Sequence, residues 1–211
     1  LSRRKIDLDM GSDSLTPIKT IYERLSVWNK ISKTPIHFHN INVQSEYDKL
    51  LNLFEIYKPN ALIHFGEQRA APYSMIGYKE AEYTVRIGTV NLLECVKQKT
   101  PDCHFVQLST MGVYGYGVIN TVIPDGYLDV EINTRNGKET KPIVFPPNPG
   151  SIYHLTKTVD HQFFQFYKKN YGLKITDLHQ GVVWGTNTDL TAKNPSLVNR
   201  FDYDGHYGTV L

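Results

Sequence analysis

Three short apolar segments, each running into glycine or polar residues, constrain the fold of this chain most strongly. They span residues 61–66, 103–109 and 173–185, and their compact apolar composition predicts buried strands of a parallel sheet. Long segments with helical spacing of apolar residues, at 78–99 and 151–171, lie between them. This alternation predicts an α/β fold, a doubly wound parallel sheet with helices on both faces.

Further elements are predicted before the first of these strands. Thr16 as N-cap and Pro17 at the first helical position predict a helix that runs to residue 31. Alternating side chains predict a short strand over residues 35–41. Ser45 is the expected cap of the next helix, which must end before Pro59 because the residue before a proline avoids helical geometry.

The unusual sequence of this chain gathers where the predicted strands end. Gly-Glu-Gln-Arg follows the first strand, Ser-Thr-Met-Gly-Val-Tyr-Gly the second, and His-Gln-Gly-Val-Val-Trp-Gly the third. Ligands of doubly wound sheets bind beyond the carboxyl ends of the strands, so these loops are the expected site. Between the second and third strands, Asn136–Gly137 predicts the turn of a hairpin, and Gly172 the end of the long helix.

Composition excludes several classes of function. With 40% hydrophobic and 21% charged residues and a net charge of +2, the chain is typical of a soluble domain without a basic face for nucleic acid or membrane. No apolar run approaches the roughly 18 residues that span a bilayer, and the first residues lack a signal-peptide core. Cys95 and Cys103 are the only cysteines, so reduced thiols and a cytoplasmic location are expected.

Tyr153 and Lys157 are the strongest candidates for chemistry. At i,i+4 spacing they share one face of the predicted helix, and a nearby ammonium favours the phenolate that could accept an alcohol proton. The spacing alone is weak, because about one Tyr-x-x-x-Lys is expected by accident with 14 tyrosines. Thr110, at the end of the preceding strand, would supply a second hydroxyl at the same rim of the sheet, which favours function.

Five stretches of the chain together resemble a known superfamily. They are HFGEQRAAPYSM (64–75), STMGVYG (109–115), YHLTK (153–157), DLHQGVVWG (177–185) and NRFDYDGHYGT (199–209). They resemble the extended short-chain dehydrogenase/reductase superfamily of nucleotide-sugar enzymes, which implies a Rossmann-like fold and bound NAD. Within it, the stretches and the hairpin are similar to the UDP-sulfoquinovose synthase family.

The resemblance implies a mechanism. NAD would take a hydride from C4 of UDP-glucose while Tyr153 accepts the hydroxyl proton. Water would then be lost across C5 and C6, sulfite would add at C6, and the hydride would return to C4. Lys157 would also hold the nicotinamide ribose, and Thr110 the sugar hydroxyl. Free sulfite or a sulfite-donating protein would supply the sulfur.

The elimination needs an acid/base group of its own. Met111 and Gly112 stand where plain sugar dehydratases carry an Asp-Glu pair, and Val113 where other members of the synthase family carry Glu. His154 is the candidate replacement because its pKa range suits proton transfer. A helix histidine hydrogen-bonded to backbone is the alternative interpretation of His154.

The resemblance also implies a set of binding residues. The expected cofactor contacts are Leu1, Ser2, Arg4, Phe65, Gly66, Glu67, Ser109, Tyr153, Lys157 and Val183. The expected substrate contacts are Arg69, Thr110, Gln180 and Arg200, with Arg69 binding sulfite or a phosphate. No metal is expected, since His37 and His39 share a strand face without a third ligand.

The expected organisation is that of a central fragment. The chain lacks the Gly-x-x-Gly-x-x-Gly loop that binds NAD phosphates in this superfamily. Residues 1–185 would form the NAD-binding Rossmann-like domain, incomplete at its N-terminus, with a hairpin insertion at about 126–146; residues 186–211 would begin the substrate-binding lobe. A homodimer through the helices at 78–99 and 151–171 is implied by the resemblance.

Two alternative functions are left open. A UDP-glucose 4-epimerase or another nucleotide-sugar epimerase needs the same Thr110, Tyr153 and Lys157 but neither elimination nor sulfite. A non-catalytic nucleotide-sugar-binding scaffold would keep the fold without the chemistry.

Overall fold

The described part of the chain alternates strands and helices as predicted. The computed structural model describes residues 11, 18–68, 70–115, 122–124, 126–181 and 188–198. The elements in chain order are α2 (Ile21–Ile31), α3 (Tyr47–Tyr57), β1 (Ala61–His64), α4 (Ala71–Ser74), α5 (Tyr78–Ala81), η1 (Glu82–Ile87), α6 (Gly88–Lys99), β2 (His104–Thr110), η2 (Met111–Tyr114), β3 (Tyr127–Thr134), β4 (Gly137–Val144), α7 (Ile152–Tyr171), β5 (Ile175–Gln180), α8 (Asp189–Lys193) and η3 (Pro195–Leu197).

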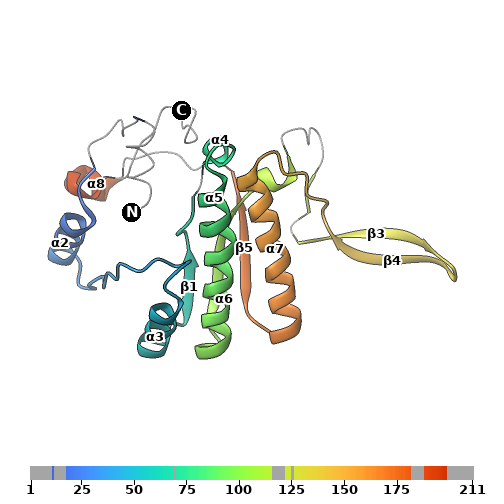
Figure 1. Cartoon of the computed structure of the whole chain (residues 1–211), viewed down its shortest axis with the longest axis horizontal. Helices are drawn as coiled ribbons and strands as arrows, with labels where there is room; N and C mark the ends of the chain where they lie inside the picture. Colours follow the sequence, from blue (N-terminus) through green and yellow to red (C-terminus); the bar gives the residue numbers. More distant parts are fainter. Residues whose placement is uncertain are drawn as a thin grey trace.

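A parallel sheet forms the centre of the fold. Its strands lie in the order β1-β2-β5, with Ala61 opposite His104 and Thr110 opposite Gln180. Helices α3, α6 and α7 lie in front of the three strands in Figure 1. The parallel α/β architecture predicted from the alternation is therefore confirmed.

The core lies between these helices and the facing side of the sheet. Phe105 of β2 and Phe164 of α7 stack with ring centroids 5.7 Å apart, and Leu93 of α6 is fully buried. The opposite side of the described sheet is more open, with Ile63 57% and Leu178 45% exposed. The expectation that all three strands are buried on both sides is wrong for β1 and β5, because the described helices cover one side only.

Helix α7 begins and ends as its sequence predicts. Ser151 is the N-cap, and Gly172 adopts φ +71° at the C-terminal end, where a side chain would be strained. The hairpin of β3 and β4 is also present and projects away from the sheet in Figure 1. Its turn is Arg135–Asn136, one residue earlier than predicted, and Gly137 begins β4 with φ +110°.

Three predictions near the N-terminus need correction. Helix α2 begins after Thr20 and not after Thr16, because Thr20 and Glu23 form a capping box, while residues 12–17 lie outside the described residues. Residues 35–41 form no strand, since β1 pairs only with β2 within the described sheet. The cap of α3 is Glu46 and not Ser45.

The long helix predicted over residues 78–99 is continuous but not uniform. Its middle section, η1, has π-helical geometry between α5 and α6. Cys95 and Cys103 are free and buried in the core, and burial raises the pKa of the Cys95 thiol to about 12. No helix in the described ranges is both long and apolar enough to cross a bilayer.

Candidate functional site

The first turn of α7 positions Tyr153, His154 and Lys157 together. The Ser151 hydroxyl accepts a hydrogen bond from the His154 backbone N–H at 3.2 Å, which fixes the start of the helix. The Tyr153 backbone N–H donates to the hydroxyl of Ser74 in α4 at 3.0 Å. The Lys157 Nζ lies 6.0 Å from the centroid of the Tyr153 ring. The predicted sharing of one helix face by Tyr153 and Lys157 is confirmed.

Lys157 is held in a buried site. Its side chain is fully buried, forms an ion pair with Glu67 and donates to the Leu108 carbonyl at 2.5 Å. The Glu67 carboxylate also accepts from the Gln107 side chain at 2.5 Å. Burial raises the pKa of Glu67, while the Lys157 ammonium and the Gln107 amide oppose that rise. An ammonium has three donors, so one N–H of Lys157 has no acceptor among the described residues.

This buried polar cluster extends to residues that sequence reasoning missed. The Thr89 hydroxyl donates to Asp160 at 2.9 Å, and burial together with the charge of Glu67 raises the pKa of Asp160 well above its usual value. His64 lies 3.3 Å from the Glu67 carboxylate. Burial and the Lys157 charge lower the pKa of His64 to about 3, so His64 is neutral and this contact is not an ion pair.

A sequence signal for the missed residues exists. His64 and Gln107 are polar residues inside strand segments that otherwise read as apolar, and Asp160 lies one turn from Lys157. Buried polar residues are the informative exceptions in a core, because each needs a partner. These three could therefore have been flagged as partners of Lys157 and Glu67.

The turn after β2, which Thr110 caps, lies against His154 of α7. The Thr110 hydroxyl accepts from the Gly112 backbone N–H at 3.1 Å and caps η2. A Cβ on Gly112 would lie 2.1 Å from the Nε2 of His154, so only glycine leaves room for this imidazole. Val113, in the same turn, is buried and apolar.

His154 is therefore placed against the turn that follows Thr110. Its Nδ1 lies 3.1 Å from the Ser151 hydroxyl, and burial lowers the pKa of His154, which favours the neutral imidazole. The ring contacts a side-chain hydroxyl and the Gly112 turn. A neutral imidazole can accept a proton.

The remaining predicted residues fall into two groups. Phe65 is exposed after β1, Gly66 donates its backbone N–H to His64 at 3.3 Å, and Gln180 lies opposite Thr110 at the end of β5. Glu67 turns inward and pairs with Lys157, and its expected contact with the cofactor stays a prediction. The second group lies outside the described residues: Leu1, Ser2, Arg4, Arg69, Val183 and Arg200.

Two features of the described residues fit a nicotinamide cofactor. The Ser109 hydroxyl is buried at the strand end and has no hydrogen-bond partner there. The third N–H of the Lys157 ammonium lacks an acceptor among the described residues, and a ribose hydroxyl would supply one. Both groups belong to residues predicted to contact NAD.

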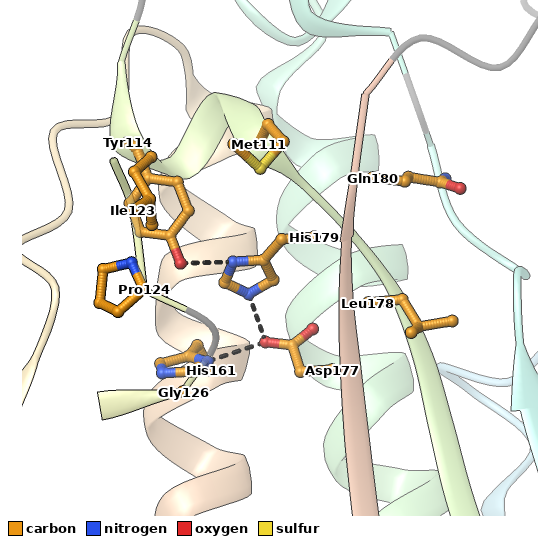
Figure 2. A pocket seen from close by; sticks show the side chains of 10 residues that line it. All are labelled: Met111, Tyr114, Ile123, Pro124, Gly126, His161, Asp177, Leu178, His179 and Gln180. Atoms are coloured by element: carbon orange, nitrogen blue, oxygen red, sulfur yellow. Dashed lines mark hydrogen bonds and ion pairs between the residues drawn. The ribbon is translucent and has the colours of Figure 1, made fainter. Parts of the chain in front are cut away.

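An open hollow of about 660 Å³ lies beside the carboxyl end of β5 (Figure 2). Its polar wall consists of Tyr114, His161, Asp177 and His179, which point toward one another. Burial tends to raise the pKa of Asp177, but hydrogen bonds from His161 and His179 hold it below the usual value. Gln180 projects from the other side of the strand in Figure 2.

The chain is similar to known nucleotide-sugar enzymes. Residues 11–181 match the family described as GDP-mannose 4,6 dehydratase. The whole chain is 41% identical to the chloroplastic UDP-sulfoquinovose synthase of Spinacia oleracea, of which it covers 43%. It is 37% identical over its whole length to the UDP-sulfoquinovose synthase of Sulfolobus acidocaldarius, of which it covers 53%. The chain thus spans about half the length of these relatives.

Solved structures support the fold. The UDP-glucose 4-epimerase of Thermus thermophilus in complex with NAD superposes with a TM-score of 0.55 and 24% identity, covering 76% of this chain and 45% of that one. At this identity the likeness concerns the fold alone. It agrees with the predicted Rossmann-like architecture.

Proposed function

Because the chain belongs to the GDP-mannose 4,6 dehydratase family, we propose that this protein is a UDP-sulfoquinovose synthase that converts UDP-glucose and sulfite to UDP-sulfoquinovose. The single observation that carries the proposal is the start of α7, where Tyr153, His154 and a buried Lys157 lie within two turns and His154 faces the Gly112 turn that Thr110 caps. The likeness to two synthases over the whole chain supports it.

Bound NAD would supply the reversible removal of a hydride from C4 of the sugar. Ser109 and the third donor of Lys157 would hold it, together with the exposed Phe65 beyond β1. The Lys157 ammonium stabilises the phenolate of Tyr153, which accepts the proton of the C4 hydroxyl and becomes a phenol. Thr110 donates a hydrogen bond to the same sugar oxygen and fixes its orientation.

The elimination falls to His154. Once C4 is a ketone, the proton on C5 is acidic, and the neutral imidazole can accept it. The C6 hydroxyl leaves as water when it takes that proton from the imidazolium. Sulfite, arriving as bisulfite, then forms the bond to C6 and gives its proton to the neutral imidazole, which passes it to C5.

Partners and assembly belong to the same proposal. We infer a homodimer through the continuous helix of α5, η1 and α6 and through α7, supported by the exposed Tyr83 and Phe166 on these two helices. A cytoplasmic location remains a prediction. Light scattering of the purified protein tests the dimer. A monomer at micromolar concentration would contradict it.

The deciding experiment uses the full-length protein with UDP-glucose, with and without sulfite, and mass spectrometry of the products. We expect a sulfonated sugar nucleotide only with sulfite, and its loss in Tyr153→Phe. Conversion to UDP-galactose regardless of sulfite would establish the epimerase alternative. If neither product forms and the purified protein retains no NAD, the scaffold alternative is favoured.

A further inference from the structure

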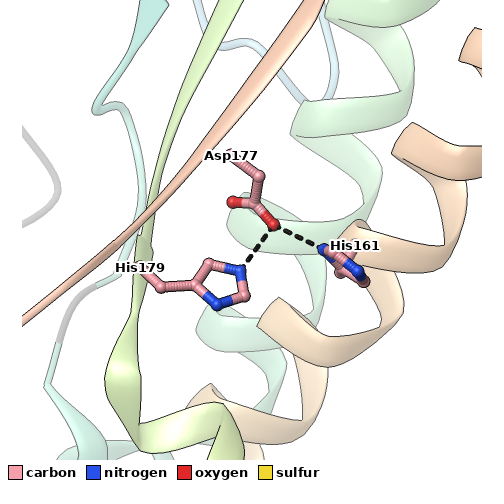
Figure 3. Close-up of side chains that lie close together, drawn as sticks. All are labelled: His161, Asp177 and His179. Atoms are coloured by element: carbon pink, nitrogen blue, oxygen red, sulfur yellow. Dashed lines mark hydrogen bonds and ion pairs between the residues drawn. The ribbon is translucent and has the colours of Figure 1, made fainter. Parts of the chain in front are cut away.

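Three side chains that the proposed mechanism does not use converge beside β5 (Figure 3). His161 comes from α7, and Asp177 and His179 come from β5. The His161 Nδ1 and the His179 Nε2 each lie 2.8 Å from the same oxygen, Oδ2 of Asp177. One nitrogen or oxygen from each residue lies within 4.8 Å of the others.

The fold explains why these residues meet. Asp177 and His179 are two positions apart on one strand, so their side chains leave the same side of the sheet. That side faces α7, since Asp177 pairs in register with Gln107, whose side chain contacts the Glu67–Lys157 pair. His161 lies one turn beyond Lys157 on α7 and reaches the same place.

The charge of the group is incompletely balanced. The Asp177 side chain is 10% exposed, and its ion-pair partners among the described residues are the two imidazoles, with no lysine or arginine. Two atoms, Oδ1 of Asp177 and Nε2 of His161, are buried without a hydrogen-bond partner in the described part of the chain. Both imidazoles bond one carboxylate oxygen, and the other oxygen is buried without a partner, so this polar group can still take a positive ligand.

We propose that His161, Asp177 and His179 bind a divalent transition-metal ion of the zinc type. Two imidazoles and one carboxylate are a ligand set that zinc accepts, with bonds of about 2.0–2.1 Å that hold ligand atoms about 3.3 Å apart. The ion would bind between the carboxylate and the two rings. Each distance between the carboxylate oxygen and a ring nitrogen, now 2.8 Å, would have to lengthen by about 0.5 Å to admit the ion.

Two further features complete the site. The Tyr114 hydroxyl lies 2.7 Å from Nδ1 of His179 and would orient that ring, as outer partners of metal-bound histidines do. All three ligands line the hollow beside β5, so a fourth position is open to water or to a small anion (Figure 2). This site is independent of the proposed synthase activity.

The test is titration of the chelator-treated full-length protein with Co²⁺, read by its visible absorption, and metal analysis after addition of Zn²⁺. We expect one ion per chain and the strong absorption bands of a tetrahedral site. Asp177→Asn, which preserves the shape of the side chain, should weaken binding by about 100-fold or more. Tyr114→Phe should weaken it by about tenfold.

Matched variants keep the proposal falsifiable. His104→Gln is the control, because His104 bonds to Thr176 on the opposite side of the sheet and should leave binding unchanged. His179→Cys should retain binding, since a thiolate is a zinc ligand, whereas a network of hydrogen bonds alone would not be rescued by a thiol. A folded wild-type protein that shows no cobalt bands, or equal binding by Asp177→Asn, would overturn the proposal.

Discussion

The close approach of His154 to Gly112 gives the sharpest prediction. In Gly112→Ala, the new methyl group would lie 2.1 Å from Nε2 of His154, whereas non-bonded atoms prefer about 3.5 Å. The imidazole must therefore retreat by roughly 1.4 Å. Its room is limited, because the ring is buried and Nδ1 contacts the Ser151 hydroxyl at 3.1 Å.

The expected cost can be worked from this displacement. Overpacking of this kind destabilises by about 1–3 kcal/mol. For a chain of this size that corresponds to about 2–4 °C in Tm for each kcal/mol. If His154 transfers a proton, a displacement above 1 Å should also reduce the rate of sulfosugar formation by about 100-fold.

Thermal unfolding and product formation by mass spectrometry measure the two effects on full-length protein. Gly181→Ala is the control for stability, since a Cβ there meets no atom within 4 Å in the described residues. In Gly112→Ala/His154→Ala the methyl has room, so the two stability costs should be less than additive by about 1–3 kcal/mol. Additive costs, or a Gly112→Ala protein as stable as the Gly181→Ala protein and as active as the wild type, would refute the reasoning.

The buried cluster around Lys157 yields the other predictions. Glu67→Gln leaves the Lys157 ammonium buried without a carboxylate and should destabilise the protein by about 3–5 kcal/mol in urea unfolding. The pKa of Asp160 is raised on folding, so wild-type stability should decline as pH rises above about 4. Asp160→Asn should reduce that decline, and identical pH profiles of stability would contradict the prediction. The pKa of His64 is lowered to about 3, so stability should be lost as pH falls from about 6.5 toward 3, and His64→Gln should reduce that loss in acid-unfolding curves.

The fold was predictable where local chemistry and tertiary packing agree. Helix α7 shows this agreement, since Ser151 and Gly172 end it as their residue types favour. Residues 35–41 show the opposite case. Their alternation is that of a strand, but a strand needs a partner for its backbone, and the described sheet provides none.

The candidate site was predictable only in part for a related reason. Tyr153 and Lys157 follow from helical spacing, which is a local property. The contacts of Lys157 with Glu67, and of His154 with Gly112, join segments far apart in the chain. Spacing says nothing about such contacts, so the inward turn of Glu67 and the role of Gly112 emerged only from the structure.

One consequence follows from the way Ser151 is used. A single hydroxyl caps the backbone of α7 and also contacts the ring of His154. The first turn of a helix opens and closes more easily than its middle, and each opening would release both contacts at once. Fraying of this helix end and displacement of the proposed proton acceptor are thus the same event, so the closed fraction of that turn sets an upper limit on the fraction of molecules ready for the proposed elimination.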